Sequence, residues 1–313
     1  MWIILAFISA FCLGCYDISK KEALRTHRVI DVLTGSVCIS ALILSVPLVL
    51  SFLCQEVMEG TLFYVPPMDL KGHMLTMIKS LIVLSSWVFA YVSLKQLPIS
   101  VVSPLQATRP MWTLVGAMLV FGERLNGWQW TGVLIALGTV FLFSLYSRKT
   151  ATLKVESQKP KAAGINPYYL YLALAILIGA CSGLYDKFLM RHYDHNAVQV
   201  WYTFYQAVIM CFAWYFYNYD RKTLTLKPTS LSPSGKLVGS CLLISVFLVI
   251  SDNVYMLALQ DPDSLIAVVS TIRRGGAVIG FAYGLLFLKE KDPLPKILCM
   301  IGISIGLLCL AFG

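Results

Sequence analysis

Six ionisable side chains lie within or at the ends of long apolar stretches of this sequence, where a charge is costly. They are three cations and three acids: Arg109, Arg273, Arg274, Asp252, Asp17 and Asp186. A charge at the centre of a membrane helix costs about 2.5–3.5 kcal/mol, so such groups face one another or a water-filled cavity. We therefore expect these residues to lie in the interior of a helical bundle.

The three arginines suggest a cationic site for an anionic or zwitterionic solute. A guanidinium group presents a planar fork of donors that fits a carboxylate or a phosphate. Internal salt bridges with the three acids are an alternative explanation, and the sequence does not decide between the two. Arg273 and Arg274 are adjacent, about 100° apart on a helix, so one is expected to bind while the other pairs or extends toward water.

Asp252 and Asn253 interrupt an apolar run at Leu242–Ile250. A buried acid there could carry a coupling proton, because desolvation would raise its pKa. We favour the simpler interpretation, in which Asp252 pairs with an arginine of a neighbouring helix. Asn253, Trp87 and Gln106 complete the predicted solute-binding set, because they lie in spans expected to line the central cavity.

Asp17 and Asp186 each follow a tyrosine, Tyr16 and Tyr185, near the end of an apolar run. We predict that each Tyr-Asp pair helps to close a gate at its own membrane face. The alternative is ordinary anchoring, since tyrosines and charged groups are enriched at membrane interfaces. Glu123 and Glu290 end helices beside basic residues and are expected to be exposed.

The elements that must position these residues are membrane helices. The 313 residues are 58% hydrophobic and 13% charged, with a mean hydropathy of +0.74, which excludes a soluble globule and a disulfide-stapled secreted domain. A helix needs about 20 apolar residues to cross a bilayer. Ten runs satisfy this: Trp2–Ser19, Val29–Leu53, His73–Leu94, Ile99–Phe121, Gly127–Ser147, Asn166–Met190, Asn196–Tyr219, Leu237–Leu259, Ser264–Leu288 and Pro293–Phe312. The predicted fold class is an all-α integral membrane protein.

The net charge of +9 reflects membrane topology, with no nucleic-acid partner expected. Loops on one side of the predicted bundle carry 17 Lys and Arg residues, whereas the opposite side carries 5. The positive-inside rule then places the basic loops in the cytoplasm and both termini outside. Trp2 begins the first apolar run with no basic region before it, so no cleavable signal peptide is expected.

The two halves of the chain repeat each other. Residues 12–17 (Cys-Leu-Gly-Cys-Tyr-Asp) match residues 181–186 (Cys-Ser-Gly-Leu-Tyr-Asp) at four positions, at an offset of 169. The helix pair containing Val101-Val102-Ser103 and Val268-Val269-Ser270 repeats at an offset of 167. We predict a first five-helix repeat at 1–147, a basic cytoplasmic linker at 148–165 and a second repeat at 166–313. An odd number of spans per repeat inverts the second half, which is typical of secondary transporters.

These features resemble the drug/metabolite transporter (DMT) superfamily, specifically its EamA-like ten-helix members. The likeness rests on a small-residue-rich span with Ser103-Pro104-Leu105 and Arg109-Pro110, on the helix end at 121–125 (Phe-Gly-Glu-Arg-Leu), and on the echo of that end at 288–291 (Leu-Lys-Glu-Lys). Residues 273–276 (Arg-Arg-Gly-Gly) depart from the apolar stretch expected there. Cytoplasmic termini are usual in the superfamily; we prefer the orientation given by the charge bias.

The predicted function is a secondary active transporter, an exporter or exchanger, that moves a small polar metabolite across the plasma (bacterial inner) membrane by alternating access. An anionic or zwitterionic solute such as an amino acid is the leading class, with a coupling proton or a counter-solute. A channel or a non-transporting receptor is the main alternative, followed by an intramembrane lipid-modifying enzyme. No enzymatic activity, metal or cofactor is expected. A monomer is sufficient, and a dimer is not excluded.

Overall fold

The computed structural model is almost entirely helical. It describes residues 1–24, 26–96, 109–152, 167–220, 225–226, 235–276, 279, 297–298, 301–302, 304–306 and 308–309. In chain order the elements are α1 (Trp2–Leu24), α2 (Val29–Leu53), α3 (Gln55–Met58), α4 (Leu70–Gln96), α6 (Arg109–Phe121), α7 (Gly127–Thr152), α8 (Pro167–Met190), α9 (His195–Asn218), β1 (Tyr219–Asp220), β2 (Thr225–Leu226), α10 (Gly235–Gln260) and α11 (Ile266–Arg274). The two short strands form an antiparallel pair, with Tyr219 opposite Leu226.

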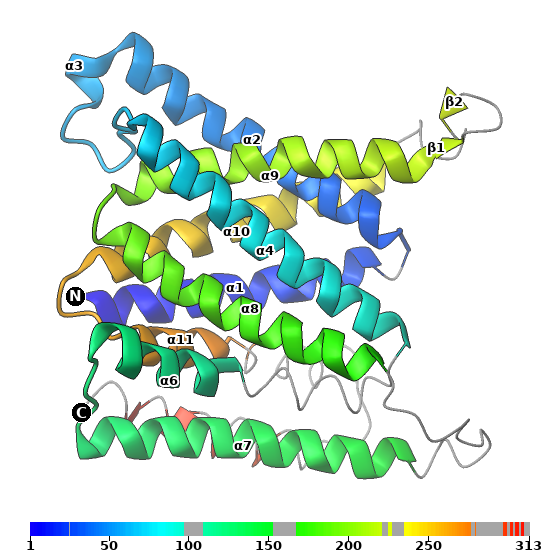
Figure 1. The fold of residues 1–313 in the computed structure, drawn as a ribbon, viewed down its shortest axis with the longest axis vertical. Helices are drawn as coiled ribbons and strands as arrows, with labels where there is room; N and C mark the ends of the chain where they lie inside the picture. The colour runs from blue at the N-terminus through cyan, green and yellow to red at the C-terminus, as the bar shows by residue number, and fades with distance from the viewer. Residues whose placement is uncertain are drawn as a thin grey trace.

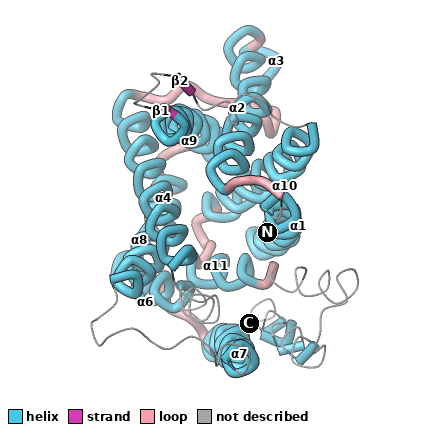
Figure 2. The backbone as a smooth tube through the Cα atoms, turned by 90° about the vertical axis from the view of Figure 1, so that its right-hand side faces the viewer, coloured by secondary structure: helices cyan, strands magenta, loops and turns pink. Residues whose placement is uncertain are grey.

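The long helices lie side by side across the molecule, and the short helices α6 and α11 lie next to each other beside α1 and α8 (Figures 1 and 2). Short connections at 191–194 and 261–265 reverse the chain between successive helices. One face of the bundle therefore carries the start of α1 and these connections. We call it the N-terminal face, and the face where α1 and α4 end the opposite face.

Five of the described helices contain a stretch long and apolar enough to cross a membrane. These stretches are Trp2–Lys20, Val29–Leu53, Leu70–Ala90, Pro167–Met190 and Gly235–Gln260. Large apolar side chains such as Phe11, Leu42 and Leu243 are exposed on the outside of the bundle, whereas Ser9 and Thr76 are completely buried. This inverted distribution is expected of a bundle whose surroundings are lipid.

Serine side chains join the helices across their interfaces. Ser9 Oγ on α1 donates to the carbonyl oxygen of Ser251 on α10 at 2.8 Å, and Ser251 Oγ donates back to the Ser9 carbonyl at 3.0 Å. Ser86 Oγ on α4 donates to the Ala175 carbonyl on α8 at 2.9 Å. Small residues let helices approach closely in a membrane, and their hydroxyl groups bond across the contact.

The most extensive contacts join helices from different halves of the chain. Helix α1 packs on α10, α4 packs on α8, and α2 packs on α9. Helix α1 also contacts α11, and α8 also contacts α6. The thiols of Cys38 on α2 and Cys211 on α9 lie 3.4 Å apart. The described helices of the first half are therefore packed mainly against those of the second half.

Two glycines allow the contact between α1 and the end of α11. A Cβ atom added to Gly14 would lie 2.7 Å from the carbonyl oxygen of Gly276, and one added to Gly276 would lie 2.5 Å from the carbonyl oxygen of Ala10. Real Cβ atoms do not approach backbone atoms so closely. The absence of a side chain at both positions therefore permits this close contact between the two backbones.

The described helices coincide with seven predicted spans to within a few residues, although α1 extends to Leu24 and therefore includes Lys20. Of the predicted span Ile99–Phe121, the structure describes only α6. Of Ser264–Leu288 it describes residues 264–276 and 279. Most of Pro293–Phe312, the linker from residue 153 onward, and Glu290 lie outside the described residues.

Candidate functional site

A cavity of about 300 Å³ lies at the centre of the bundle, between α1, α4, α6, α8, α9, α10 and α11. Five cationic and three acidic side chains line it: Lys20, Lys79, Arg109, Arg273, Arg274, Asp17, Asp186 and Asp252. All six ionisable residues singled out in the sequence are among them. The structure therefore gathers the predicted intramembrane charges at one place, together with two lysines that the sequence analysis had assigned to loops.

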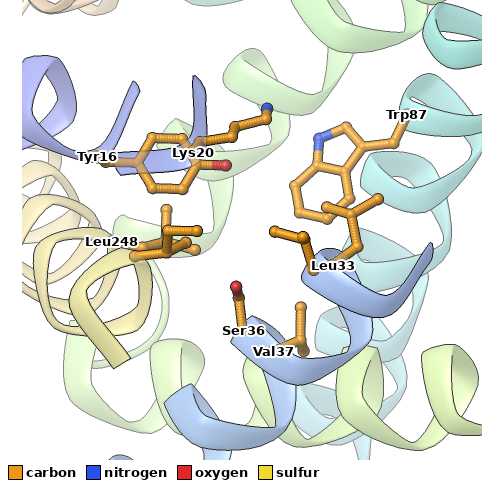
Figure 3. A pocket seen from close by; sticks show the side chains of 9 residues that line it. Tyr16, Lys20, Leu33, Ser36, Val37, Trp87 and Leu248 are labelled. Carbon is orange, nitrogen blue, oxygen red and sulfur yellow. The ribbon is translucent and has the colours of Figure 1, made fainter. Parts of the chain in front are cut away.

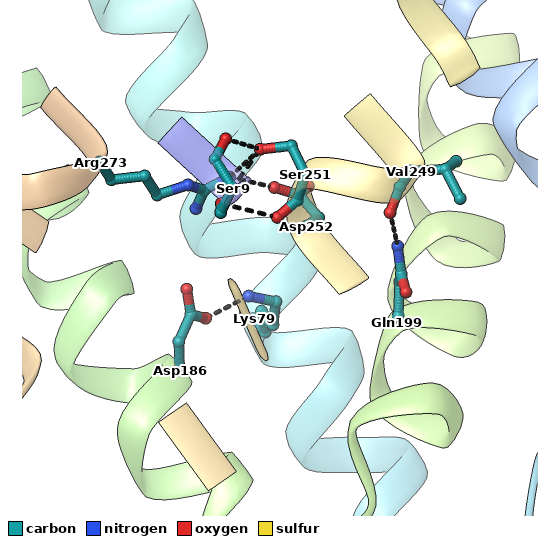
Figure 4. Close-up of polar contacts among 8 residues, drawn as sticks. All are labelled: Ser9, Lys79, Asp186, Gln199, Val249, Ser251, Asp252 and Arg273. Carbon is teal, nitrogen blue, oxygen red and sulfur yellow. Dashed lines mark hydrogen bonds and ion pairs between the residues drawn. The ribbon is translucent and has the colours of Figure 1, made fainter. Parts of the chain in front are cut away.

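Arg273 and Asp252 form an ion pair between α11 and α10 (Figure 4). Arg273 also donates to the Ser251 hydroxyl oxygen at 3.3 Å, and its guanidinium carbon lies 4.0 Å from the centre of the Tyr255 ring. Asp252 thus has the salt-bridge partner favoured from the sequence. Arg274, the next residue after Arg273, lines the same cavity. The two adjacent arginines therefore both reach this cavity from α11.

A second ion pair, absent from the predicted set, joins Lys79 on α4 to Asp186 on α8 (Figure 4). The ammonium group of Lys79 lies 4.5 Å from the centre of the Tyr202 ring, which gives it a cation–π contact as well. Asp186 was predicted to close a gate together with Tyr185. Asp186 lines the central cavity, as does Asp17, so the two acids share one site, and the gating role stays a prediction.

Arg109, the first described residue of α6, reaches toward α8. Its Nη2 donates to the carbonyl oxygen of Gly179 at 2.6 Å. A Cβ atom at position 179 would lie 2.3 Å from the guanidinium carbon, so the absence of a side chain there makes room for the arginine. The planar fork of Arg109 has further donors that can face the cavity.

An adjoining cavity of about 310 Å³ extends from this centre toward the opposite face. It shares Tyr16, Asp17, Lys20, Trp87, Arg109 and Arg274 with the central cavity. Its remaining wall is mostly apolar and comprises Leu33, Ala90, Ala175 and Ile176, together with Ser86. The two hollows therefore form one charged passage that becomes more apolar on one side.

Tyr16 and Trp87 also border a much smaller slot of about 10 Å³ between α1, α2, α4 and α10 (Figure 3). Figure 3 shows the two aromatic rings on opposite sides of this slot, with the Lys20 ammonium group above it. A space of this size holds no more than about one water molecule. The central and adjoining cavities, of about 300 and 310 Å³, have the same two aromatic residues in their walls.

Two predicted residues, Asn253 and Tyr185, are not among those that line the central cavity. Asn253 is turned toward α9, where its amide group donates to Asn196 Oδ1 and Gln199 Oε1, both at 2.8 Å. Gln199 in turn donates to the Val249 carbonyl oxygen at 2.7 Å (Figure 4), so these contacts tie α10 to α9. The Tyr185 hydroxyl donates to the Leu75 carbonyl oxygen at 3.1 Å. Gln106 lies outside the described residues.

Two contacts join neighbouring helices to the start of α11 at the N-terminal face. Glu123 accepts hydrogen bonds from the backbone N–H groups of Ile266 at 2.8 Å and Ala267 at 3.3 Å. Lys187 donates to the backbone carbonyl and, at 2.6 Å, to the hydroxyl oxygen of Ser264. We call these contacts the latch. The expectation that Glu123 is an exposed helix-end charge was wrong, since it is 7% exposed.

The position of the Glu123 side chain follows from the backbone conformation at the end of α6. Helix α6 ends at Phe121, and Gly122 adopts a φ of 64°, a left-handed conformation that glycine tolerates without strain. The turn directs Glu123 at the start of α11, where the first backbone N–H groups of a helix have no partner within it. The N-cap residue of α11, Leu265, provides no side-chain hydrogen bond, so Glu123 supplies the cap from another helix.

Lys79 and Lys187 were not predicted as interior residues, because both were counted among the basic residues that set the membrane topology. Yet both lie inside their own predicted spans, His73–Leu94 and Asn166–Met190, and both are buried, with 3% and 1% of the residue exposed. A lysine well inside an apolar run is a signal of pairing in the same way as an arginine. Among the described residues, no group of three or more His, Cys, Asp or Glu side chains could hold a metal ion.

Comparison with known proteins agrees with this architecture. Residues 1–145 match the EamA-like transporter family, which is part of the drug/metabolite transporter superfamily. This match to a family of membrane transporters covers just under half of the chain and confirms the resemblance inferred from the sequence. One crystal structure of a protein superposes with a TM-score of 0.70 over 99% of this chain and 96% of that chain, at 12% identity, which shows a shared fold. No curated protein matches the chain significantly.

Proposed function

We propose that this chain is a secondary active transporter that moves a small polar metabolite through the central cavity by alternating access. The observation that carries the proposal is a charged cavity that is closed toward the N-terminal face by the latch and continues toward the opposite face. A passage closed at one end and extended at the other is what one state of an alternating-access cycle requires. The match to a transporter family supports the same conclusion.

The inverted repeat is part of this proposal, and the helix contacts support it. If the offset relates α1 to α8, α2 to α9 and α4 to α10, the contacts should come in matched sets. The contact of α1 with α10 then corresponds to that of α8 with α4, and the contact of α2 with α9 corresponds to itself. Rocking of one half against the other would break the contacts of Glu123, which join the two halves, and would open the N-terminal face.

We further propose that the solute is bound by the arginines of the cavity, and that export or exchange is the direction of transport. The surplus of basic residues in the connections of the opposite face supports a cytoplasmic location of that face under the positive-inside rule. A cavity reached from that side is suited to collecting a solute from inside the cell. The membrane would be the plasma membrane, which in a bacterium is the inner membrane.

Counterflow in proteoliposomes tests the proposal. Vesicles loaded with one metabolite of a panel at high concentration are exposed to a trace of the same labelled metabolite, with and without a proton gradient. A transporter gives transient, saturable accumulation, which a variant with Arg109→Ala should lose while Arg124→Ala, a change at an exposed arginine, retains it. Single-channel currents would show a channel instead, and no flux of any metabolite would contradict the proposal.

A further inference from the structure

The cavity wall near Arg109 contains both cationic and apolar side chains. Arg109 and Arg274 provide two guanidinium groups that line both the central and the adjoining cavity. The adjoining cavity then meets Trp87 on α4 and Ile176 on α8, with Ala175 beside it. The walls of this space therefore combine two cationic forks with aromatic and aliphatic side chains.

The balance of charge in the cavity favours an anion. Its eight charged side chains comprise five cations and three acids. Two of the acids are already occupied, because Asp186 pairs with Lys79 and Asp252 pairs with Arg273. Arg109 contacts a backbone carbonyl, that of Gly179, which is a dipole and not a compensating charge. Excess positive charge in a membrane is costly, and a bound anion would reduce that cost.

A solute with an ammonium group has a less favourable position. Asp17 is the remaining acid among the described cavity residues, and it lies in the field of Lys20, Arg274 and Arg273. An ammonium group placed beside Asp17 would be repelled by these cations. The same wall that attracts a carboxylate or phosphate therefore disfavours the zwitterionic class that the sequence left open.

We infer that the transported solute is an organic anion that carries a flat apolar group and has no ammonium group. Its anionic head lies between Arg109 and Arg274, and its apolar group lies against Trp87 and Ile176. A guanidinium pair binds such a head through charge-assisted hydrogen bonds, and the aromatic face of Trp87 provides apolar contact area. This inference rests on the proposed transport function and specifies its substrate class.

Four simple probes separate the classes on the full-length protein in detergent or nanodiscs. They are 3-phenylpropionate, an aromatic anion; propionate, the anion without a ring; phenylalanine, the zwitterion; and phenethylamine, the cation. Protection against thermal unfolding is measured for each at millimolar concentration, followed by counterflow with each labelled probe. We expect 3-phenylpropionate to protect and to exchange, propionate to bind about tenfold more weakly or worse, and the other two to have no effect.

Three variants link the result to the site. Arg274→Gln should weaken binding of 3-phenylpropionate by about tenfold or more, whereas Arg124→Gln should not change it. Trp87→Leu should reduce the preference for 3-phenylpropionate over propionate without abolishing binding of either anion. Because the four-probe comparison uses the unaltered protein, it stands even if a variant fails to fold.

Results that contradict the substrate class can be distinguished from results that contradict the transport function. Equal protection by phenylalanine or phenethylamine, or no protection by 3-phenylpropionate, would overturn the inference. Flux of an uncharged or cationic metabolite would do the same while leaving the transport function intact. Absence of flux for every metabolite of the panel would instead reject the transport function on which the inference rests.

Discussion

Lys79 on α4 and Asp186 on α8 form an ion pair in the interior of the bundle, where 3% of the lysine side chain and 10% of the aspartate side chain are exposed. Removing one partner leaves the other charge buried without compensation, which costs about 3–5 kcal/mol in fully buried pairs. We expect Lys79→Met or Asp186→Leu to lower the free energy of unfolding by about 3 kcal/mol, near the lower limit because both groups line a cavity.

The double variant Lys79→Met/Asp186→Leu tests whether this loss comes from the pair. It removes both charges together, so its stability should recover toward that of the unaltered protein. Thermal or denaturant unfolding of the four proteins gives the coupling energy as a double-mutant cycle. Strict additivity of the two single losses would show that the ion pair contributes no coupling.

Replacing Glu123 should loosen the latch. Glu123→Ala removes the acceptor for the N–H groups of Ile266 and Ala267, and loss of a helix cap costs about 0.5–2 kcal/mol. Glu123→Gln keeps one acceptor oxygen and should lose less. Denaturant unfolding measures both, and the exposed Glu56 provides the control, since Glu56→Ala should change stability by less than about 0.5 kcal/mol.

Adding a methyl group at Gly14 should separate α1 from α11. The nearest obstacles are the Gly276 carbonyl oxygen and the side chain of Ile279, both within 2.8 Å of the new Cβ atom, and a backbone carbonyl cannot rotate away. Overpacking of this kind costs about 1–3 kcal/mol, so Gly14→Ala should lower the melting temperature and the transport rate. The matched variant is Gly239→Ala, where no atom lies within 4 Å and a neutral or slightly stabilising effect is expected.

Asp194, in the connection between α8 and α9, should make stability depend on pH. Partial burial raises the pKa of its carboxyl group, but the interaction with His195 and the hydrogen bonds from the N–H groups of Ala197 and Asn196 outweigh this effect. The pKa therefore lies below its ordinary value in the folded protein. A group with a lowered folded pKa contributes stability above its unfolded pKa of about 3.9 and loses that contribution as the pH falls through the folded value.

We therefore expect the unfolding midpoint of the unaltered protein to fall on acidification below about pH 5, and Asp194→Asn to reduce this dependence. Asparagine is as good a helix cap as aspartate, so the variant should keep the cap of α9 near neutral pH. Asp263→Asn, at an exposed acid on the same face, serves as the control. An identical pH profile for all three proteins would rule out a role for Asp194.

Membrane insertion and the presence of intramembrane charges could be predicted from the sequence because both depend on local composition. A run of apolar residues sets a span wherever it occurs, and Arg109 or Asp252 inside such a run must find a polar environment. The partners of these charges could not be predicted in the same way. Lys79 and Asp186 are 107 positions apart, so their contact depends on which helices become neighbours.

The direction in which a side chain points from its helix could not be predicted from the sequence either. Asn253 follows Asp252 directly but points to α9 instead of the cavity, since one step along a helix rotates a side chain by about 100°. Glu123 appeared to be a helix-end charge because its place beside Arg124 says nothing about the start of α11, 143 residues further along. The sequence shows where a costly charge lies, whereas the fold decides what compensates it.

During synthesis, α1 and α4 emerge from the ribosome long before α10 and α8, the helices on which they pack. Until then Ser9, Lys79 and Glu123 lack the partners described above, and the polar side of each helix faces lipid or insertion machinery. We therefore expect the first half to depend on the second for its stability in the membrane. A chain interrupted in the basic linker would present the same unpartnered groups permanently.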